Sequence, residues 1–322
     1  MKIKFHGARG SNPIAITPAR IDEISKFIWE FAKKNPRKSW KEAQQLLKDL
    51  PRSKHQVFGG ATTCLELKSP LAPFPIFFDA GTGLTSAGGD KTSGLANKSF
   101  REGKGKMAIF LTHTHWDHII GLPTLGQIFK EGNEFHFYGV HKELSRRLSV
   151  LFQDEYFPVP YRVVEKNFQF HQIPLHSEVR LGKLTVTHCP QSHPGGSFAY
   201  RVDDGKKSMI FATDTSLKHI VRSTEAGERF YSNADVLIVD AQFSPEDIVS
   251  REDWGHSEIY TAVDFSVREN TKQLFLFHQS PTYSDADIDG QLKRARQYHR
   301  KKYGKAHPLQ IHMATEGNEI KV

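Results

Sequence analysis

Residues Thr112 to Gly121 read Thr-His-Thr-His-Trp-Asp-His-Ile-Ile-Gly, and they bring three histidines and one aspartate into a single turn: His113, His115, Asp117 and His118. Neutral imidazole and carboxylate are common metal ligands. Crowded imidazoles repel one another once they are protonated, which argues against a solvated polar loop as the reason for this cluster. The stretch therefore predicts a metal site.

An apolar run, Met107 to Leu111, comes directly before this loop and is typical of a buried strand. The loop then lies at the carboxyl end of a strand, where α/β sheets usually carry their chemistry. Side chains two residues apart on an extended segment point the same way, so His113 and His115 can reach one ion. Asp117 and His118 lie further round the turn and can reach a second.

Length and composition are those of an ordinary globular chain. The 322 residues suffice for one large α/β domain or two small ones, and 38% of them are hydrophobic. Two cysteines, Cys64 and Cys189, are too few for a disulfide scaffold or a thiolate metal site. The sequence shows no signal-peptide pattern and no apolar run of membrane-spanning length. We therefore expect a cytoplasmic protein without a membrane partner.

The chain is basic, with a formal net charge of +8. This charge favours anionic partners such as phosphate esters or nucleic acid, and it is equally compatible with a basic solvated surface. Much of the excess lies in two stretches, Lys33 to Lys54 and Lys293 to Lys305. Both are expected to be exposed helical faces or ends.

A helical hairpin is predicted near the start of the chain. Thr17 and Pro18 suit the start of one helix, and Ser39 with Glu42 has capping-box spacing for a second. Because strand signals lie on both sides, we expect a single domain, 1–322, with a helical insertion at about 17–55. Residues 84–106 are expected to form a mobile loop. The aromatic segment 152–170 could be a lid over the site or packed irregular structure.

Other polar residues also follow predicted strands. Asp79 ends one strand, His193 lies just past another, and Asp214 and His278 follow two more. Asp79 is a candidate to accept a hydrogen bond from a ligand histidine and fix its tautomer, with turn capping as the alternative. His256 comes directly before a predicted helix, 257–267.

The loop, followed by His193, Asp214 and His278 in that order, resembles the metallo-β-lactamase superfamily, whose pattern is His-x-His-x-Asp-His followed by a lone histidine, an aspartate and a final histidine. The resemblance covers roughly residues 1–16 and 56–312. It implies an α/β fold, the four-layer αββα metallo-β-lactamase sandwich, with a two-metal site between the sheet edges.

Carried over by position, the resemblance implies that His113, His115 and His193 hold one ion, that Asp117, His118 and His278 hold the other, and that Asp214 bridges them. This donor set suits two divalent ions, Zn²⁺ in the first place, with Mn²⁺ or Fe as alternatives. Three assignments have competitors in the sequence: His188 for His193, His256 for His278, and for Asp214 the residues Asp203, Asp204 and Asp240.

Three segments are similar to the phosphodiesterase branch of the superfamily, which includes ribonuclease Z, PhnP-type cyclic phosphodiesterases and cyclic-nucleotide phosphodiesterases. They are the Gly-x-x-Gly-Ser start at 7–11, the Phe-Asp-Ala-Gly-Thr-Gly strand end at 78–83, and Trp-Gly-His-Ser at 254–257. The resemblance implies that His256 contacts the phosphate and acts as general acid, favoured by a helix N-terminus. His256 and Asp117 are thus the candidate catalytic residues, and helix capping or packing is the alternative for His256.

We expect a dimetal hydrolase, a phosphodiesterase acting on cyclic nucleotides or related small phosphodiesters. The first rival is a ribonuclease Z-like endoribonuclease acting on RNA, against which we count the lack of a glycine-rich basic arm in the sequence. The second is a non-catalytic protein that binds a nucleotide or a metal. The sequence leaves open whether the protein is a homodimer.

Overall fold

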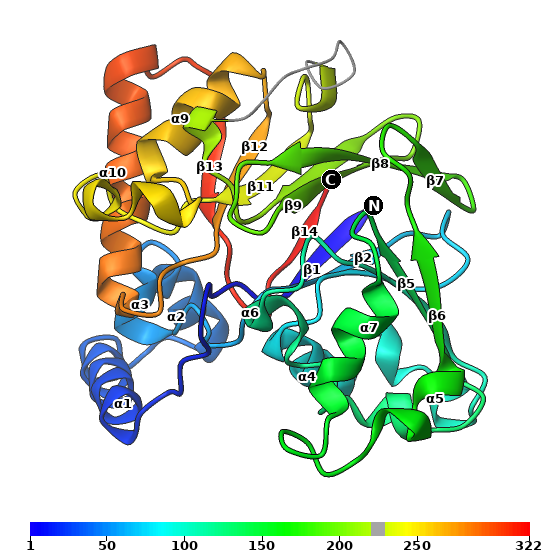
Figure 1. Cartoon of the computed structure of the whole chain (residues 1–322). Coiled ribbons are helices and arrows are strands. Elements are labelled where there is room, and N and C mark those ends of the chain that lie inside the picture. The colour runs from blue at the N-terminus through cyan, green and yellow to red at the C-terminus, as the bar shows by residue number, and fades with distance from the viewer. Residues whose placement is uncertain (220–228) are drawn as a thin grey trace.

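Two seven-stranded sheets form the centre of the computed structural model, which describes residues 1–219 and 229–322 (Figure 1). In spatial order, the first sheet consists of β14 (Glu319–Lys321), β1 (Lys2–Gly7), β2 (Cys64–Lys68), β3 (Ile76–Phe78), β4 (Lys106–Phe110), β5 (Glu134–Gly139) and β6 (Phe168–Gln172). The second consists of β13 (Gln310–Met313), β12 (Gln273–Phe277), β11 (Val236–Asp240), β10 (Ser208–Ala212), β9 (Ser197–Asp203), β8 (Leu184–Gln191) and β7 (Glu178–Leu181).

Each sheet is half antiparallel and half parallel. Strands β3 to β6 run parallel in the first sheet, and β10 to β13 in the second. The remaining neighbours pair antiparallel. Parallel strands that share a sheet end at the same edge, so the loops that follow them meet there.

Helices cover the outer faces of the two sheets, and others lie in the N-terminal hairpin and in the histidine-rich loop. In the described residues they are α1 (Pro18–Lys34), α2 (Trp40–Leu47), α3 (Arg52–His55), α4 (Thr82–Gly89), α5 (Lys98–Arg101), α6 (Trp116–Ile119), α7 (Leu144–Ser149), α9 (Ile259–Arg268) and α10 (Asp285–Tyr303), with several short 3-10 turns between them. Helices α4, α5 and α7 cover the outer face of the first sheet, and α9 and α10 cover that of the second. No helix in residues 1–219 or 229–322 combines the length and apolar character needed to cross a membrane.

Three apolar layers hold these elements together. The central layer lies between the sheets and joins Phe78 and Phe110 of the first sheet to Tyr200, Phe211 and Phe277 of the second, all with 0% exposure. A second layer packs α4 and α7 against the first sheet, and a third packs α9 and α10 against the second. The order helix, sheet, sheet, helix confirms the predicted four-layer αββα sandwich (Figure 1).

Two hydrogen bonds tie the second sheet to the start of the histidine-rich loop. The Tyr200 hydroxyl on β9 donates to the carbonyl oxygen of Leu111 at 2.7 Å, and the Phe198 amide donates to that of Thr112 at 3.0 Å. Leu111 and Thr112 follow β4 and come directly before His113. The position of the loop therefore depends on how the two sheets pack.

The predicted helical hairpin is present as α1 to α3, between β1 and β2. The Thr17 side chain accepts from the Arg20 amide, and Ser39 and Glu42 form the expected capping box. The apolar stripe of α1 is not a core face, however. No residue of α1 is buried, and Ile21 is 55% exposed.

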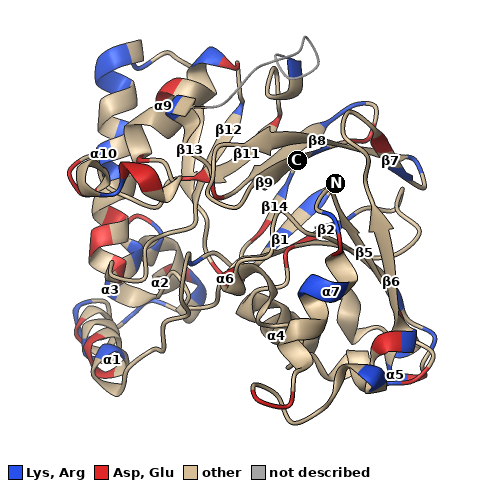
Figure 2. Ribbon diagram, in the orientation of Figure 1, with Lys and Arg blue, Asp and Glu red and all other residues tan. Residues whose placement is uncertain are grey.

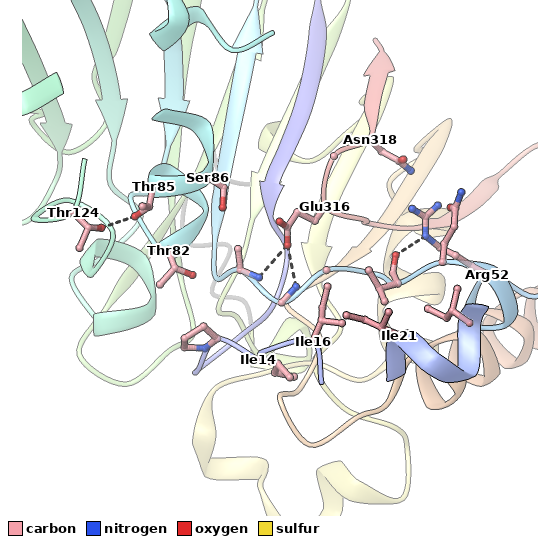
Figure 3. A pocket seen from close by; sticks show the side chains of 18 of the residues that line it. Ile14, Ile16, Ile21, Arg52, Thr82, Thr85, Ser86, Thr124, Glu316 and Asn318 are labelled. Atoms are coloured by element: carbon pink, nitrogen blue, oxygen red, sulfur yellow. Dashed lines mark hydrogen bonds between the residues drawn. The ribbon is translucent and has the colours of Figure 1, made fainter. Parts of the chain in front are cut away.

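Polar contacts attach this hairpin to α10. The guanidinium of Arg20 donates to Asp285 at 3.0 Å, and Asp289 accepts from the Ser53 amide at 2.6 Å. A cavity of about 1160 Å³ remains between the hairpin and the body (Figure 3). Isoleucines line one wall and hydroxyl side chains the other, among them Ile14, Ile16, Ile21, Thr82, Thr85 and Thr124. The cavity includes none of the predicted ligands.

The expectation of a mobile loop at 84–106 is wrong. This stretch contains most of α4 and the whole of α5, because Leu84, Ala87, Leu95 and Phe100 are buried against the first sheet. Spaced apolar anchors therefore outweigh the local excess of glycine, serine and lysine.

The aromatic segment 152–170 is packed rather than a lid. Phe152 contacts Phe157, Tyr161 and Phe168 at ring-centroid distances of 5.8, 5.9 and 6.2 Å.

Both basic stretches lie on helices at the outside of the molecule (Figure 2). Some of their cations are neutralised locally. Arg294 donates two hydrogen bonds to Glu246, and Lys302 pairs with Asp264 at 2.7 Å.

We predict that Tyr200→Phe lowers the free energy of unfolding by about 1–3 kcal/mol, because the buried carbonyl of Leu111 loses its donor. Urea denaturation followed by circular dichroism measures the change. Tyr156→Phe is the control, since Tyr156 is 70% exposed and should alter stability by less than about 0.5 kcal/mol. Equal stability of the two variants would contradict the role of this hydrogen bond.

Candidate metal centre

Asp79 organises the histidine-rich loop. It follows β3, and its Oδ1 accepts from the Thr112 amide at 2.8 Å. Its Oδ2 accepts from the Thr112 hydroxyl and from Nδ1 of His118, both at 2.8 Å. Asp79 thereby anchors the loop and directs Nε2 of His118 away from itself, as predicted for a residue that fixes a ligand's tautomer.

The structure brings the predicted ligands into two groups that share Asp214. In the first group, Nδ1 of His115 lies 2.9 Å from Nε2 of His113 and 3.1 Å from Nε2 of His193. Oδ2 of Asp214 lies 3.6 Å from Nε2 of both His113 and His193. The four donor atoms thus converge on one point.

The second group uses the other oxygen of Asp214. Its Oδ1 lies 3.1 Å from Nε2 of His118 and 3.1 Å from Nε2 of His278. Oδ2 of Asp117 lies 3.2 Å from the former atom and 3.1 Å from the latter. A carboxylate that turns one oxygen to each group has the arrangement expected of a bridging ligand.

The donor set fits divalent cations. A tetrahedral site with bonds of about 2.0–2.1 Å has ligand-to-ligand edges of about 3.3 Å, close to the observed separations of 2.9–3.6 Å. Nε2 of His118, which points into the second group, is buried without a hydrogen-bond partner. Such atoms are rare unless a ligand satisfies them.

The electrostatics of the cluster also favour a cation. Burial lowers the pKa of His113 well below its ordinary value. Burial acts on His118 in the same direction, but the charges of Asp117, Asp214 and Asp79 outweigh it and raise the pKa of His118 well above normal. The pKa values of Asp117 and Asp214 are lowered despite burial, chiefly by the charge of His118. Both carboxylates therefore stay charged.

Three of these side chains sit on strained backbone directly after strands. Asp79, Asp214 and His278 have φ values of 59°, 52° and 65°, in the left-handed region that non-glycine residues rarely adopt. Each costs of order 1–3 kcal/mol and persists only where the surroundings impose it. The sharp turn bends the chain at the strand end, where these side chains meet.

His256 lies beside both ligand groups and is held by Asp240. Its Nδ1 donates to Oδ2 of Asp240 at 2.6 Å, and its ring centroid lies 5.1 Å from that of His193 and 5.2 Å from that of His278. Asp240 ends β11, just as Asp79 follows β3. Sequence reasoning considers Asp240 only as a competitor of Asp214, although Asp240 also ends a predicted strand, which is the signal that identifies Asp79.

The expected helix N-terminus at His256 is not available to an anion. Helix α9 begins at Ile259, and its N-cap is Glu258, whose carboxylate accepts from the amides of Tyr260 and Thr261. The acidic cap occupies the donors that a phosphate would need. The position of His256 therefore depends on Asp240 instead.

Asp240, His256 and His278 also lie close enough together to form a third ligand group. Asp240 is already saturated, because it accepts from His256 and from the amides of Thr215, Ser257 and Gln242. We therefore treat these residues as a hydrogen-bonded support rather than as a metal site.

The other three competing residues lie elsewhere. His188 packs its ring 6.0 Å from that of Phe198. Asp203 pairs with Arg201, and Asp204 caps a turn by accepting from the Lys207 amide.

Comparison with known proteins gives consistent matches. A model described as a β-lactamase superfamily domain matches residues 76–279. Ribonuclease Z of Prochlorococcus marinus is 26% identical over 235 residues, which cover 56% of this chain and 72% of that protein. Two solved structures share the fold over 100% of this chain and 99% of their own: unliganded yeast PDE1, at a TM-score of 0.64 and 14% identity, and the short form of human tRNase Z, at 0.62 and 16%.

We predict that Asp79→Asn weakens zinc binding by about 10- to 100-fold, because an amide cannot hold both Thr112 and His118 as the carboxylate does. Competition with a chromophoric chelator measures the affinity. Asp235→Asn is the control, since Asp235 is a similarly buried carboxylate that pairs with Lys207 and Lys272 instead. Unchanged zinc affinity in folded Asp79→Asn protein would contradict the assignment.

Proposed function

The chain belongs to the metallo-β-lactamase superfamily of metal-dependent hydrolases, and we propose that it is a two-metal phosphodiesterase acting on cyclic nucleotides or related small phosphodiesters. The observation that carries the proposal is the His256–Asp240 pair beside both ligand groups. Such a pair serves a reaction in which a leaving oxygen must be protonated.

We infer that His113, His115 and His193 hold one cation, that Asp117, His118 and His278 hold the other, and that Asp214 is shared. Zinc suits these nitrogen and oxygen donors best, with manganese or iron as alternatives. When bound, two such cations supply Lewis-acid chemistry, which lowers the pKa of water and stabilises charge on a phosphoryl oxygen.

His256 is the proton donor in this proposal. Its Nδ1 is bonded to Asp240, and in the described part of the chain its Nε2 has no hydrogen-bond partner. Burial lowers the pKa of His256, but the charge and hydrogen bond of Asp240 outweigh burial and raise the pKa above its ordinary value. The Asp240 contact thus favours the protonated imidazole, which can give its proton to an alkoxide.

Asp117 supports the proposed chemistry from the loop after β4 of the first sheet, whereas His256 belongs to the segment after β11 of the second. Its Oδ2 accepts from the Ser11 amide at 2.8 Å and lies 3.1 Å from Nε2 of His278. These contacts fix the carboxylate, so its charge stays directed at the second ligand group.

We predict that His256→Ala lowers kcat for 3′,5′-cyclic AMP by about 10²- to 10⁴-fold while zinc content is retained. Hydrolysis of bis(p-nitrophenyl) phosphate should fall far less, because p-nitrophenolate is a weak base that leaves without a proton. His307→Ala is the control, because His307 follows α10 and pairs with His299 of that helix rather than with a residue of the cluster. Equal losses on both substrates would contradict the role of His256 as an acid.

A substrate panel on zinc-loaded wild-type protein tests the reaction class. We expect turnover of phosphodiesters, and turnover of only a thioester or a lactone would refute the proposal. The non-catalytic alternative is excluded if His113→Ala or Asp117→Ala abolishes turnover in folded protein.

An endoribonuclease is the second candidate, because the curated relatives are named ribonuclease Z. Salt-sensitive binding of precursor transfer RNA, with cleavage at one defined 3′ position, would favour this candidate over a small-molecule phosphodiesterase.

A further inference from the structure

The ligand cluster opens to solvent on one side, at His115. Of the seven predicted ligands, His115 alone is exposed, His193 is intermediate, and the others are buried. The link between β8 and β9 borders this opening, since a side chain at Gly195 would lie 3.6 Å from Nε2 of His115. A substrate therefore reaches the cluster past His115.

Trp116 is an exposed aromatic residue next to His115, the exposed ligand. It lies between His115 and Asp117 in the chain, opens α6, and is 72% exposed. Among the described residues, no aromatic ring packs against its indole. Exposure of so large an apolar ring contributes nothing to folding, so folding alone does not account for a tryptophan here.

Trp254 is a second exposed tryptophan, on a segment that contacts His193. The next residue, Gly255, accepts from Nδ1 of His193 through its carbonyl oxygen at 3.0 Å. Gly255 has a φ of 73°, and a side chain there would collide with His193 and Pro194, so this segment runs directly against the ligand. Trp254 contacts Phe243 and Arg251 but remains 55% exposed.

The two tryptophans belong to segments that follow strands of different sheets. Trp116 belongs to the loop after β4 of the first sheet, and Trp254 to the segment after β11 of the second. Each segment carries or contacts a predicted ligand: His115 adjoins Trp116 in the chain, and His193 donates to Gly255, which follows Trp254. Because His115 and His193 approach to 3.1 Å, the two exposed tryptophans each lie next in the chain to a point of contact with this pair of ligands.

We propose that Trp116 and Trp254 are specificity-determining residues that stack on the nucleobase of the substrate and so select nucleotides over other phosphodiesters. The proposal rests on the phosphodiesterase function and deepens it. Base stacking on an aromatic side chain is favourable for every base, so these indoles favour nucleotides as a class without selecting a sequence. The phosphodiester then reaches the ligand cluster while the base remains at the opening beside His115.

Intrinsic fluorescence tests the stacking without turnover, because the chain has four tryptophans. In the double variant Trp29→Phe/Trp40→Phe, only the indoles of Trp116 and Trp254 remain. We expect AMP to quench their emission and ribose 5-phosphate, which lacks the base, to leave it unchanged. The matched control is Trp116→Phe/Trp254→Phe, which keeps Trp29 and Trp40, 64% and 62% exposed on α1 and α2. AMP should not quench this variant.

Kinetics provide the second readout. Trp116→Ala and Trp254→Ala should each raise KM for 3′,5′-cyclic AMP about tenfold with little change in kcat. KM for glycerophosphocholine, a phosphodiester without an aromatic ring, should stay the same, and the phenylalanine variants should recover most of the nucleotide affinity.

The outcomes separate this inference from the proposed function. Equal quenching by AMP and ribose 5-phosphate, or an unchanged KM for cyclic AMP in both alanine variants, overturns base stacking and leaves phosphodiester hydrolysis standing. If AMP but not ribose 5-phosphate quenches Trp116 and Trp254 in a protein that hydrolyses no phosphodiester, base stacking is supported and the proposed phosphodiesterase function is refuted.

Discussion

One buried carboxylate, Asp214, determines how the rest of the centre is arranged. It is 2% exposed and lies within 3.6 Å of histidine nitrogens from both sheets. A buried charge without partners costs several kcal/mol, so the fold must supply compensating groups at this one point. The loop after β4 supplies His113 and His118, and the second sheet supplies His193 and His278. These histidines can surround the Asp214 carboxylate only if the edges of the two sheets lie close together.

The parts that the sequence predicts well are those that depend on local pattern. The loop from His113 to His118 needs only its own spacing, and Asp79, Asp214 and His278 are marked by the apolar runs that they follow. The grouping of residues far apart in the chain came from the resemblance to the superfamily, and the structure brings these residues together because parallel strands end at a common edge. His193 was harder to assign, because His188 lies close by in the chain; His193 was favoured because Ser-His-Pro-Gly is typical of a loop, whereas His188 was expected to end a strand.

The parts that failed depend on contacts between distant segments. Asp240 supports His256 because the turn before α9 folds back on β11, and no local spacing records that approach. The helix begins later than predicted because Glu258 caps it, which removes the anion site expected at His256.

The centre is a property of the interface between the sheets rather than of either sheet alone. Tyr200 and Phe198 of the second sheet hold the backbone just before His113, so loosening the sandwich would move the ligands of the first sheet away from Asp214. The unfolded chain has no such site, and a cation that binds the folded protein must therefore stabilise it. That stabilisation offsets the strain at Asp79, Asp214 and His278, and it explains why a fold can keep buried charges and left-handed backbone at the same edge.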